Sequence, residues 1–413
     1  MSILGPYKST LKRWGLSENP FKPTPPDDIK KLAQIFYGRE AELTAAIPAL
    51  YEGRNILIRG AWGIGKTALI LRLLDCLQQE VASLNERMLV LYLNSVLGDS
   101  PQDFYRALLL AIADRLAQSN DDPEAKAIAD SLRGRTGLQS KVKTEGRVTL
   151  GFASFAGSSE SPSSAKIDDP YALLIPMLDK AQESFDRIVL AVDDLDKKDT
   201  IVVRDILEGS LDLFRRGEKR AFLMTGRGFT DLQEASLKAL GIFSEDFSLN
   251  PMSQEALYQV AINYLNLARE TPSNQPYPFT ENVLNLITQY AQGIPRQLNA
   301  ICEKVLREGA MAGCEQLDEA TFTPIWKRIQ NDVTYSLTPQ LRQLLYIAYQ
   351  AGGISEDIED RYLEQLGVYT FVELLPMLKT LESSDTLIRQ EDETGYRFLP
   401  SKLYLPPSQS DQE

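Results

Sequence analysis

The sequence has 413 residues, 43% of them hydrophobic and 24% charged, with a formal net charge of −13. This composition is that of a globular protein with room for two or three domains, and its acidic balance argues against a surface coated for nucleic acid. Histidine is absent, which excludes histidine-based catalysis and any zinc site that contains histidine.

The first 38 residues are predicted to be an irregular lead-in. Prolines at 20, 23, 25 and 26 prevent a continuous helix there, because proline lacks the amide hydrogen and fixes its own φ. A helix is predicted to open at Gly38-Arg39-Glu40 and to run to about Tyr51.

A phosphate loop follows the predicted strand Ile56–Ile58 and precedes a helix-forming run from Thr67 to Leu74. It has the form G-x-x-x-x-G-K-[ST] and consists of Gly60, Ala61, Trp62, Gly63, Ile64, Gly65, Lys66 and Thr67. Glycines let successive N–H groups converge on a phosphate, and the helix N-terminus adds partial positive charge. Lys66 is expected to reach the β- and γ-phosphates and the Thr67 hydroxyl to bind Mg²⁺, so the loop predicts ATP and Mg²⁺ as ligands.

Residues 88–94 (MLVLYLN) form a short apolar run that predicts a buried parallel strand. A helix from Pro101 to about Ala117 follows. Residues 120–168 then interrupt the alternation and are predicted to be an insertion, with a hairpin or extended arm over 147–157. Within it, residues 133–147 hold a cluster of five cations and one acid, Glu145; the cations are Arg133, Arg135, Lys141, Lys143 and Arg147.

Beyond the insertion, helices and strands alternate again, which predicts an α/β fold with a parallel sheet. The expected helices are 170–184, 201–215 and 231–240, and the expected strands are 188–192, 221–225 and 247–249.

The strand over 188–192 ends in paired acids, which is the Walker B pattern when it follows a phosphate loop. Asp193 is expected to hold Mg²⁺, because this ion prefers carboxylate oxygens. The contact is expected to run through water, since Mg²⁺ keeps much of its hydration shell. Asp194 is then placed to orient or deprotonate the attacking water.

The remaining sequence is predicted to be helical, with four helices over 254–268, 281–292, 296–308 and 318–331. Three short helices and a hairpin over 387–398 follow and predict a winged helix. The expected domains are a lead-in (1–36), a P-loop core (37–250, with the insertion 120–168), a helical lid (251–334), a winged helix (335–405) and a disordered tail (406–413).

The chain resembles AAA+ ATPases of the initiator clade, which include origin-recognition, ExeA-type and transposition-regulator ATPases. The segments that carry the resemblance are WGLSENPF (14–21), YGREAEL (37–43), GAWGIGKT (60–67), LYLN (91–94), VDDLD (192–196), MTGR (224–227) and GIPRQLNAIC (293–302). It implies an additional-strand P-loop NTPase core, a helical lid and a winged helix. It also implies that Asn94 restrains the catalytic acid, that Thr225 ends the strand as a polar sensor and that Arg296 points to the nucleotide.

Two departures from that family leave a second class open. Asp194 stands where most AAA+ proteins have glutamate, which predicts slow hydrolysis, and no arginine finger lies between Gly228 and Phe247. Paired aspartates together with Thr225-Gly226-Arg227 also resemble the STAND class of signalling ATPases, and this resemblance implies that Arg227 senses the γ-phosphate.

Two functional hypotheses follow, with different partners. The first is a slowly hydrolysing, nucleotide-dependent switch, which implies a nucleotide-dependent homo-oligomer or a protein partner. The second is a DNA-binding initiator or loader that uses the basic insertion. Residues 336–405 hold six lysines and arginines but eleven acids, so the winged helix is expected to bind protein rather than DNA.

No run of eighteen apolar residues is present, so no membrane-spanning helix is expected. Residues 1–16 lack the apolar core of a signal peptide. Cysteines 76, 302 and 314 are scattered and are expected to be buried thiols in a reducing cytoplasm.

Overall fold

The computed structural model describes residues 4–22, 29–94, 100–120, 122–136, 138–145, 148–155, 169–193, 195, 200–215, 219–226, 241–392 and 395–403. The chain divides into two compact units. The sheet unit consists of Arg39–Arg59 and Leu69–Ser248, and the helical unit of Met1–Gly38, Gly60–Ala68 and Leu249–Glu413.

A seven-stranded sheet, in the order β3-β4-β2-β5-β6-β1-β7, forms the centre of the sheet unit. The six strands from β4 to β7 in this order are parallel, and β3 pairs antiparallel with β4 at one edge. The strands are β1 Ile56–Arg59, β2 Met88–Asn94, β3 Leu138–Glu145, β4 Val148–Phe155, β5 Arg187–Asp193, β6 Arg220–Gly226 and β7 Glu245–Ser248. Because β6 lies between β1 and β5, the predicted additional-strand P-loop topology is confirmed.

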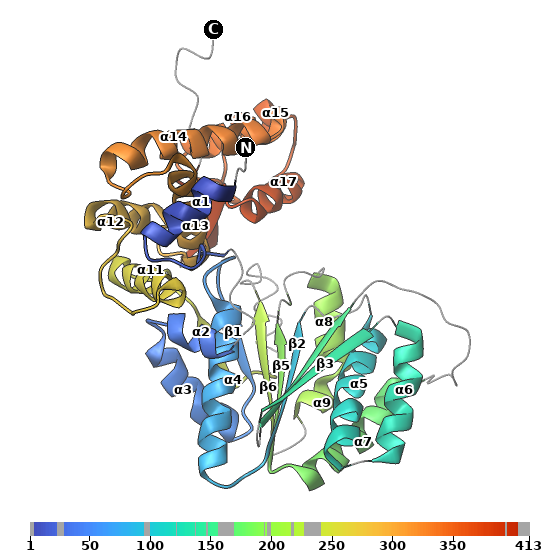
Figure 1. Cartoon of the computed structure of the whole chain (residues 1–413). Helices are drawn as coiled ribbons and strands as arrows, with labels where there is room; N and C mark the ends of the chain where they lie inside the picture. Colours follow the sequence, from blue (N-terminus) through green and yellow to red (C-terminus); the bar gives the residue numbers. More distant parts are fainter. Residues whose placement is uncertain are drawn as a thin grey trace. The chain divides into compact units, whose positions relative to one another are not determined.

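Helices cover both faces of this sheet (Figure 1). In the sheet unit they are α3 Glu40–Tyr51, α4 Lys66–Ser83 from residue 69 onward, α5 Pro101–Asn120, α6 Pro123–Thr136, α7 Pro170–Ser184, α8 Thr200–Gly209 and α9 Leu211–Arg215. The core on the α5 side includes residues 89, 91 and 93 of β2 and residues 188, 190 and 192 of β5. Side chains alternate along a strand, so Tyr92 and Asp193 lie on the opposite face.

Asn55 fixes the start of β1 from a buried position, with 7% of its surface exposed. Its amide donates to the carbonyl oxygens of Phe214 and Ile242 at 2.9 and 3.0 Å, and its own Oδ1 accepts from the Phe222 N–H at 2.9 Å. One side chain thereby joins α9, β6 and the segment before β7, at the residue from which β1 leads to the phosphate loop.

One prediction for the sheet unit is wrong in detail. The single helix expected over 201–215 is broken at Ser210, which is fully buried and donates a hydrogen bond to the Tyr105 hydroxyl at 2.9 Å. Within the stretch predicted to be an insertion, α6 is a helix and the β3–β4 hairpin adds two strands to the sheet beyond β2. β4 falls in the stretch 147–157, for which a hairpin or extended arm is predicted. The helix expected over 231–240 lies outside the described residues.

The helical unit contains α1 Leu4–Arg13, α2 Ile29–Ile35, α11 Gln254–Ala268, α12 Glu281–Tyr290, α13 Pro295–Ala312 and α14 Glu319–Ser336. Local sequence sets the helix starts. Ser253, Thr280 and Asp318 cap α11, α12 and α14 through their side-chain oxygens, and Pro295 occupies the first turn of α13. The four predicted lid helices are therefore present, with ends that differ by a few residues.

The prediction that the lead-in is irregular also needs correction, because its described residues include the two helices α1 and α2. Trp14, which follows α1, is 2% exposed, and its Nε1–H donates to the Glu315 carbonyl at 2.8 Å. The Arg13 guanidinium donates to the carbonyls of Gly313 and Cys314. Burial and hydrogen bonds at the end of α13 thus hold a segment whose prolines predict irregular structure.

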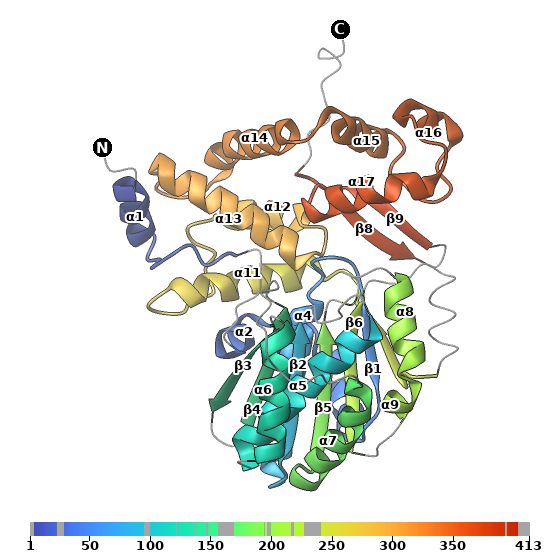
Figure 2. The ribbon, with the colours of Figure 1, turned by 90° about the vertical axis from the view of Figure 1, so that its right-hand side faces the viewer.

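The C-terminal part of the helical unit has three helices and a hairpin, as the sequence predicts (Figure 2). They are α15 Pro339–Gln350, α16 Asp360–Leu366, α17 Phe371–Ser383, β8 Leu387–Asp392 and β9 Gly395–Pro400. Leu344, Leu374 and Leu378 are fully buried in a core of their own. The assignment of this segment as a winged helix stays a prediction, as do the domain boundaries.

All three cysteines are free thiols, but only Cys302 is buried; Cys76 and Cys314 are partly exposed. Burial raises the pKa of the Cys302 thiol far above its ordinary value. Among the described helices, none combines the length and apolar character that crossing a bilayer requires.

Candidate nucleotide-binding site

The phosphate loop has the backbone that its glycines predict. Gly60, Gly63 and Gly65 have φ values of 151°, 79° and 103°, which side chains larger than hydrogen disfavour. α4 begins at Lys66, so the loop ends at a helix N-terminus, where unpaired N–H groups and the helix dipole attract anions.

Lys66 is 7% exposed and contacts its own loop. Its ammonium donates to the carbonyl oxygens of Gly60 and Ala61 at 2.9 and 3.2 Å. The ammonium is therefore held over the loop by neutral acceptors. Anionic phosphate oxygens are stronger partners for an ammonium than carbonyls are.

Arg296, at the first turn of α13, lies against the same loop. Its N–H donates to the Gly63 carbonyl at 3.3 Å, and its guanidinium carbon is 4.9 Å from the centre of the Trp62 ring, within cation–π range. A Cβ at residue 63 would lie only 2.6 Å from the Arg296 Cβ. The close approach of α13 thus requires glycine at 63.

The guanidinium of Arg296 also forms an ion pair with Asp385. Arg296 Nε lies 3.1 Å from Asp385 Oδ1, and the two side chains are 26% and 17% exposed. Sequence reasoning missed Asp385, because one acid in a turn far along the chain has no recognisable pattern.

Asp193 ends β5 in a buried hydrogen-bond network. It is 1% exposed, and its carboxylate accepts from the Tyr92 hydroxyl at 2.7 Å and from the Thr225 hydroxyl. Thr225, expected from the family resemblance as a sensor, therefore contacts the predicted metal ligand. Tyr92 was missed, although a hydroxyl two residues before Asn94 in an otherwise apolar strand was a visible signal.

The carboxylate of Asp193 and the hydroxyl of Thr67 are oxygen donors of the kind that Mg²⁺ prefers. Among the described residues, no three acidic or cysteine side chains gather into a metal cluster. The Mg²⁺ prediction therefore depends on these two oxygen donors.

Several predicted site residues cannot be placed. Asp194 and Arg227 lie outside the described residues, and for Asn94 only the backbone is described, paired with Asp193 in the register of β2 and β5. Their proposed roles stay predictions.

The basic cluster is not one surface loop. Arg133 and Arg135 belong to α6, Lys141 and Lys143 to β3, and Arg147 lies outside the described residues. The Arg133 guanidinium pairs with Asp114 at 2.5 Å and with Asp130 at 3.0 Å. The charge of Arg133 is therefore balanced by acids of the protein itself, which weakens its case as a DNA contact.

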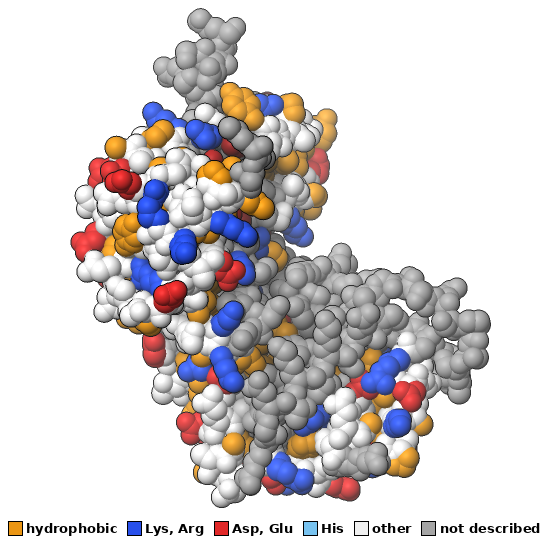
Figure 3. Space-filling view, in the orientation of Figure 1, with side chains coloured by type: hydrophobic (Ala, Val, Ile, Leu, Met, Phe, Trp, Pro, Cys, Tyr) orange, Lys and Arg blue, Asp and Glu red, His pale blue; other side chains and the backbone are white. Residues whose placement is uncertain are grey.

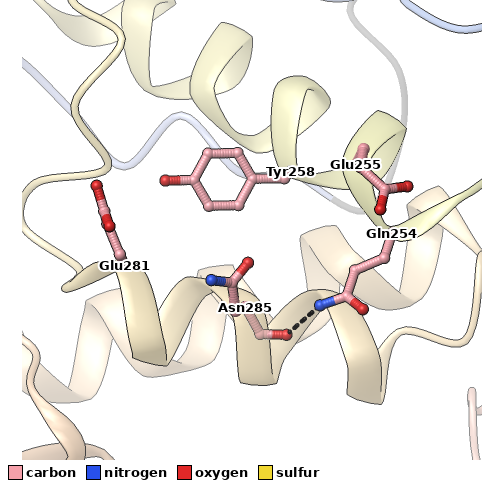
Figure 4. Close-up of a pocket in the computed structure, with 5 residues that line it drawn as sticks. All are labelled: Gln254, Glu255, Tyr258, Glu281 and Asn285. Carbon is pink, nitrogen blue, oxygen red and sulfur yellow. Dashed lines mark hydrogen bonds between the residues drawn. The ribbon is translucent and has the colours of Figure 1, made fainter.

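A groove of about 650 Å³ lies between α11 and α12 in the helical unit (Figure 4). It is lined by Gln254, Glu255, Tyr258, Glu281 and Asn285, and the Gln254 amide donates to the Asn285 carbonyl at 3.2 Å. None of these lining residues belongs to the phosphate loop, and two of them are carboxylates, which repel phosphate.

Together, the sheet order and the loop define the class of the protein as a P-loop NTPase. In agreement, residues 43–216 match the model of the KAP family P-loop domain. This match spans less than half of the chain, and no curated protein matches the sequence.

Solved structures resemble the chain over most of its length. The Aeropyrum pernix ORC2 protein, in ADPNP-ADP complexes, is 14% identical, with 89% of this chain and 90% of that chain covered and a TM-score of 0.50. The Aeropyrum pernix ORC1 protein in complex with DNA is 16% identical, with 91% of this chain and 93% of that chain covered and a TM-score of 0.49. The Thermotoga maritima RuvB Holliday junction branch migration motor is 13% identical, with 90% and 97% covered and a TM-score of 0.45.

Of these three, ORC2 has the highest TM-score, and at its low identity the likeness shows a shared fold alone. The resemblance to initiator-clade ATPases that the sequence suggests therefore extends to the fold. The chain therefore has the fold of a P-loop NTPase.

Proposed function

We propose that this protein is a slowly hydrolysing, Mg²⁺-dependent ATPase that acts as a nucleotide-dependent switch. The observation that supports this most is the contact between the phosphate loop and Arg296, which lets one arginine respond to what the loop binds. Lys66 binds the β- and γ-phosphates, and Thr67 and Asp193 hold Mg²⁺, which neutralises phosphate charge when bound.

In this proposal Asp194 orients the attacking water, Asn94 restrains that acid, and Arg227 and Arg296 contact the γ-phosphate. The shorter side chain of Asp194 makes hydrolysis slow. A two-state switch needs about 5.5 kcal/mol of differential binding to move from 1:99 to 99:1. ADP lacks the γ-phosphate. Contacts of two arginines and Mg²⁺ with the γ-phosphate of ATP can therefore supply this difference in binding free energy.

The test is calorimetric binding of ATP and ADP, together with phosphate release. K66A is expected to weaken ATP binding at least about tenfold, which corresponds to 1.4 kcal/mol, whereas D194N is expected to retain binding and lose hydrolysis. The matched control is K126A, which removes an exposed lysine of α6. A wild-type protein that binds no ATP, or a K66A variant that binds as tightly as K126A, would refute the proposal.

A protein partner at the C-terminal segment is part of the same proposal. Tyr369 and Val372, at the start of α17, are 89% and 69% exposed, and Lys379 is the single cation of that helix. A helix that reads DNA needs cations to meet phosphates, so these apolar side chains favour protein binding. ATP-dependent homo-oligomerisation is the simplest form of such an interaction.

DNA binding is the alternative function, supported by Lys141 and Lys143 on the edge strand β3. On the face of the helical unit drawn in Figure 3, cations and acids are interspersed, so this face has no continuous basic patch. A salt-dependent shift of labelled duplex DNA that is lost in a K141A/K143A/R147A variant would support this alternative. Absence of binding at low salt would exclude it.

A further inference from the structure

Arg296 is shared between two parts of the helical unit. On one side its backbone N–H and its guanidinium contact the phosphate loop, at Gly63 and Trp62. On the other side its Nε pairs with the Asp385 carboxylate at 3.1 Å. A guanidinium that already has a carboxylate partner must exchange it, in whole or in part, before it can bind a phosphate.

Asp385 occupies the turn between α17 and β8. It has a φ of 61°, a left-handed conformation that aspartate and asparagine tolerate better than most residues. Its carbonyl oxygen accepts a hydrogen bond from the Gln297 amide at 2.8 Å. Two adjacent residues of α13 therefore hold one residue of the C-terminal segment, one through its side chain and one through its backbone.

The electrostatics of this pair favour exchange. Burial raises the pKa of Asp385, and the opposing effects of Arg296 and Lys304 do not fully offset it. Desolvation of a buried ion pair can exceed its Coulombic gain, so the carboxylate loses little when it leaves the guanidinium for water. A terminal phosphate carries more charge and accepts two parallel N–H bonds from arginine.

We propose that Asp385 is a positioning residue that competes with the terminal phosphate of ATP for Arg296. In the nucleotide-free protein the Arg296–Asp385 pair holds the α17–β8 turn against α13. When ATP takes Arg296, this turn is released and the C-terminal segment gains freedom to bind its partner. The inference rests on the proposed function and names the residue through which nucleotide state reaches that segment.

The test compares the affinities of a non-hydrolysable ATP analogue and of ADP for wild type, D385N and D357N. Asparagine keeps the shape and the tolerance for positive φ but removes the competing charge. Asp357 is an exposed acid of the same segment and controls for net charge. D385N is expected to bind the ATP analogue about tenfold more tightly, with ADP affinity within about twofold, because ADP lacks the phosphate that Arg296 would contact.

The dependence on Arg296 separates competition from a general effect on folding. In an R296Q background, D385N is expected to have no further effect on affinity for the ATP analogue. Unchanged or weaker binding of the analogue by D385N, or an equal gain in the R296Q background, would overturn the inference. If wild type binds neither nucleotide, the proposed function itself fails; if only K66A loses binding while D385N is neutral, the inference alone fails.

A measurement on the wild-type protein keeps the proposal testable should D385N not fold. Amide hydrogen exchange in the peptide that contains Asp385 is expected to be faster with the ATP analogue than with ADP, while exchange in α11 stays the same. Equal exchange in the two nucleotide states would contradict release of the turn.

Discussion

Gly63 shows how a single position serves both the loop and its neighbour. Its φ of 79° and the 2.6 Å approach of the Arg296 Cβ to a Cβ built there both require glycine. The phosphate-loop pattern predicts a glycine at this position because it lets backbone N–H groups converge on a phosphate. Its second role, the packing of α13, becomes visible only in the structure.

We predict that G63A destabilises the protein more than G313A does. Gly313 ends α13 with a similar φ of 71°, and a Cβ there meets nothing within 4 Å, so the two variants share backbone strain of about 1–3 kcal/mol. Only G63A adds the clash with Arg296. Urea unfolding measures the free energy of unfolding of both variants. An equal loss of stability in the two would show that the packing of α13 does not depend on this contact.

The Tyr92 hydroxyl is predicted to orient Asp193 for Mg²⁺. Y92F removes a hydrogen-bond donor to the buried Asp193 carboxylate and leaves the ring, so the half-saturating Mg²⁺ concentration for nucleotide binding should rise about tenfold. Affinity for nucleotide in EDTA should not change. Y105F is the control, since the Tyr105 hydroxyl is also buried in the sheet unit but bonds Gly209 and Ser210. An unaltered Mg²⁺ requirement in Y92F would contradict this role.

At the scale of elements, the predictable parts of the fold are those with a strong local pattern. β2, β5 and β6 are buried on both faces and therefore read as continuous apolar runs, and the lid helices have caps and apolar periodicity. The break at Ser210 and the pairing of β4 with β2 depend on contacts between segments far apart in the chain, which no local pattern indicates. The same holds for the Arg296–Asp385 pair, which joins positions 89 residues apart.

α1 is the clearest example of an element that tertiary contacts create. Trp14 anchors it with 2% of its surface exposed and a hydrogen bond to Glu315. We predict that W14A lowers the free energy of unfolding by about 3–5 kcal/mol, as deletion of a buried aromatic ring does. Y369A, which removes a ring that is 89% exposed, should change it by less than about 0.5 kcal/mol. Thermal and urea unfolding compare the two, and equal stability of both variants would show that the lead-in is not anchored.

For the whole molecule, a P-loop that contacts Arg296 and an Arg296 that contacts Asp385 form a continuous chain of contacts within the helical unit. Such a chain gives the terminal phosphate a route to the C-terminal segment. Coupling of this kind needs an element with two arrangements that both ligands bias, and the α17–β8 turn is the element proposed here.

The most direct test of the switch is the hydrodynamic radius of the monomer, measured by sedimentation velocity with saturating ADP and then with a non-hydrolysable ATP analogue. We predict that wild type sediments differently in the two states and that K66A sediments alike in both. A wild-type protein with the same radius and the same proteolytic pattern in ADP and in the ATP analogue would contradict a nucleotide-dependent switch.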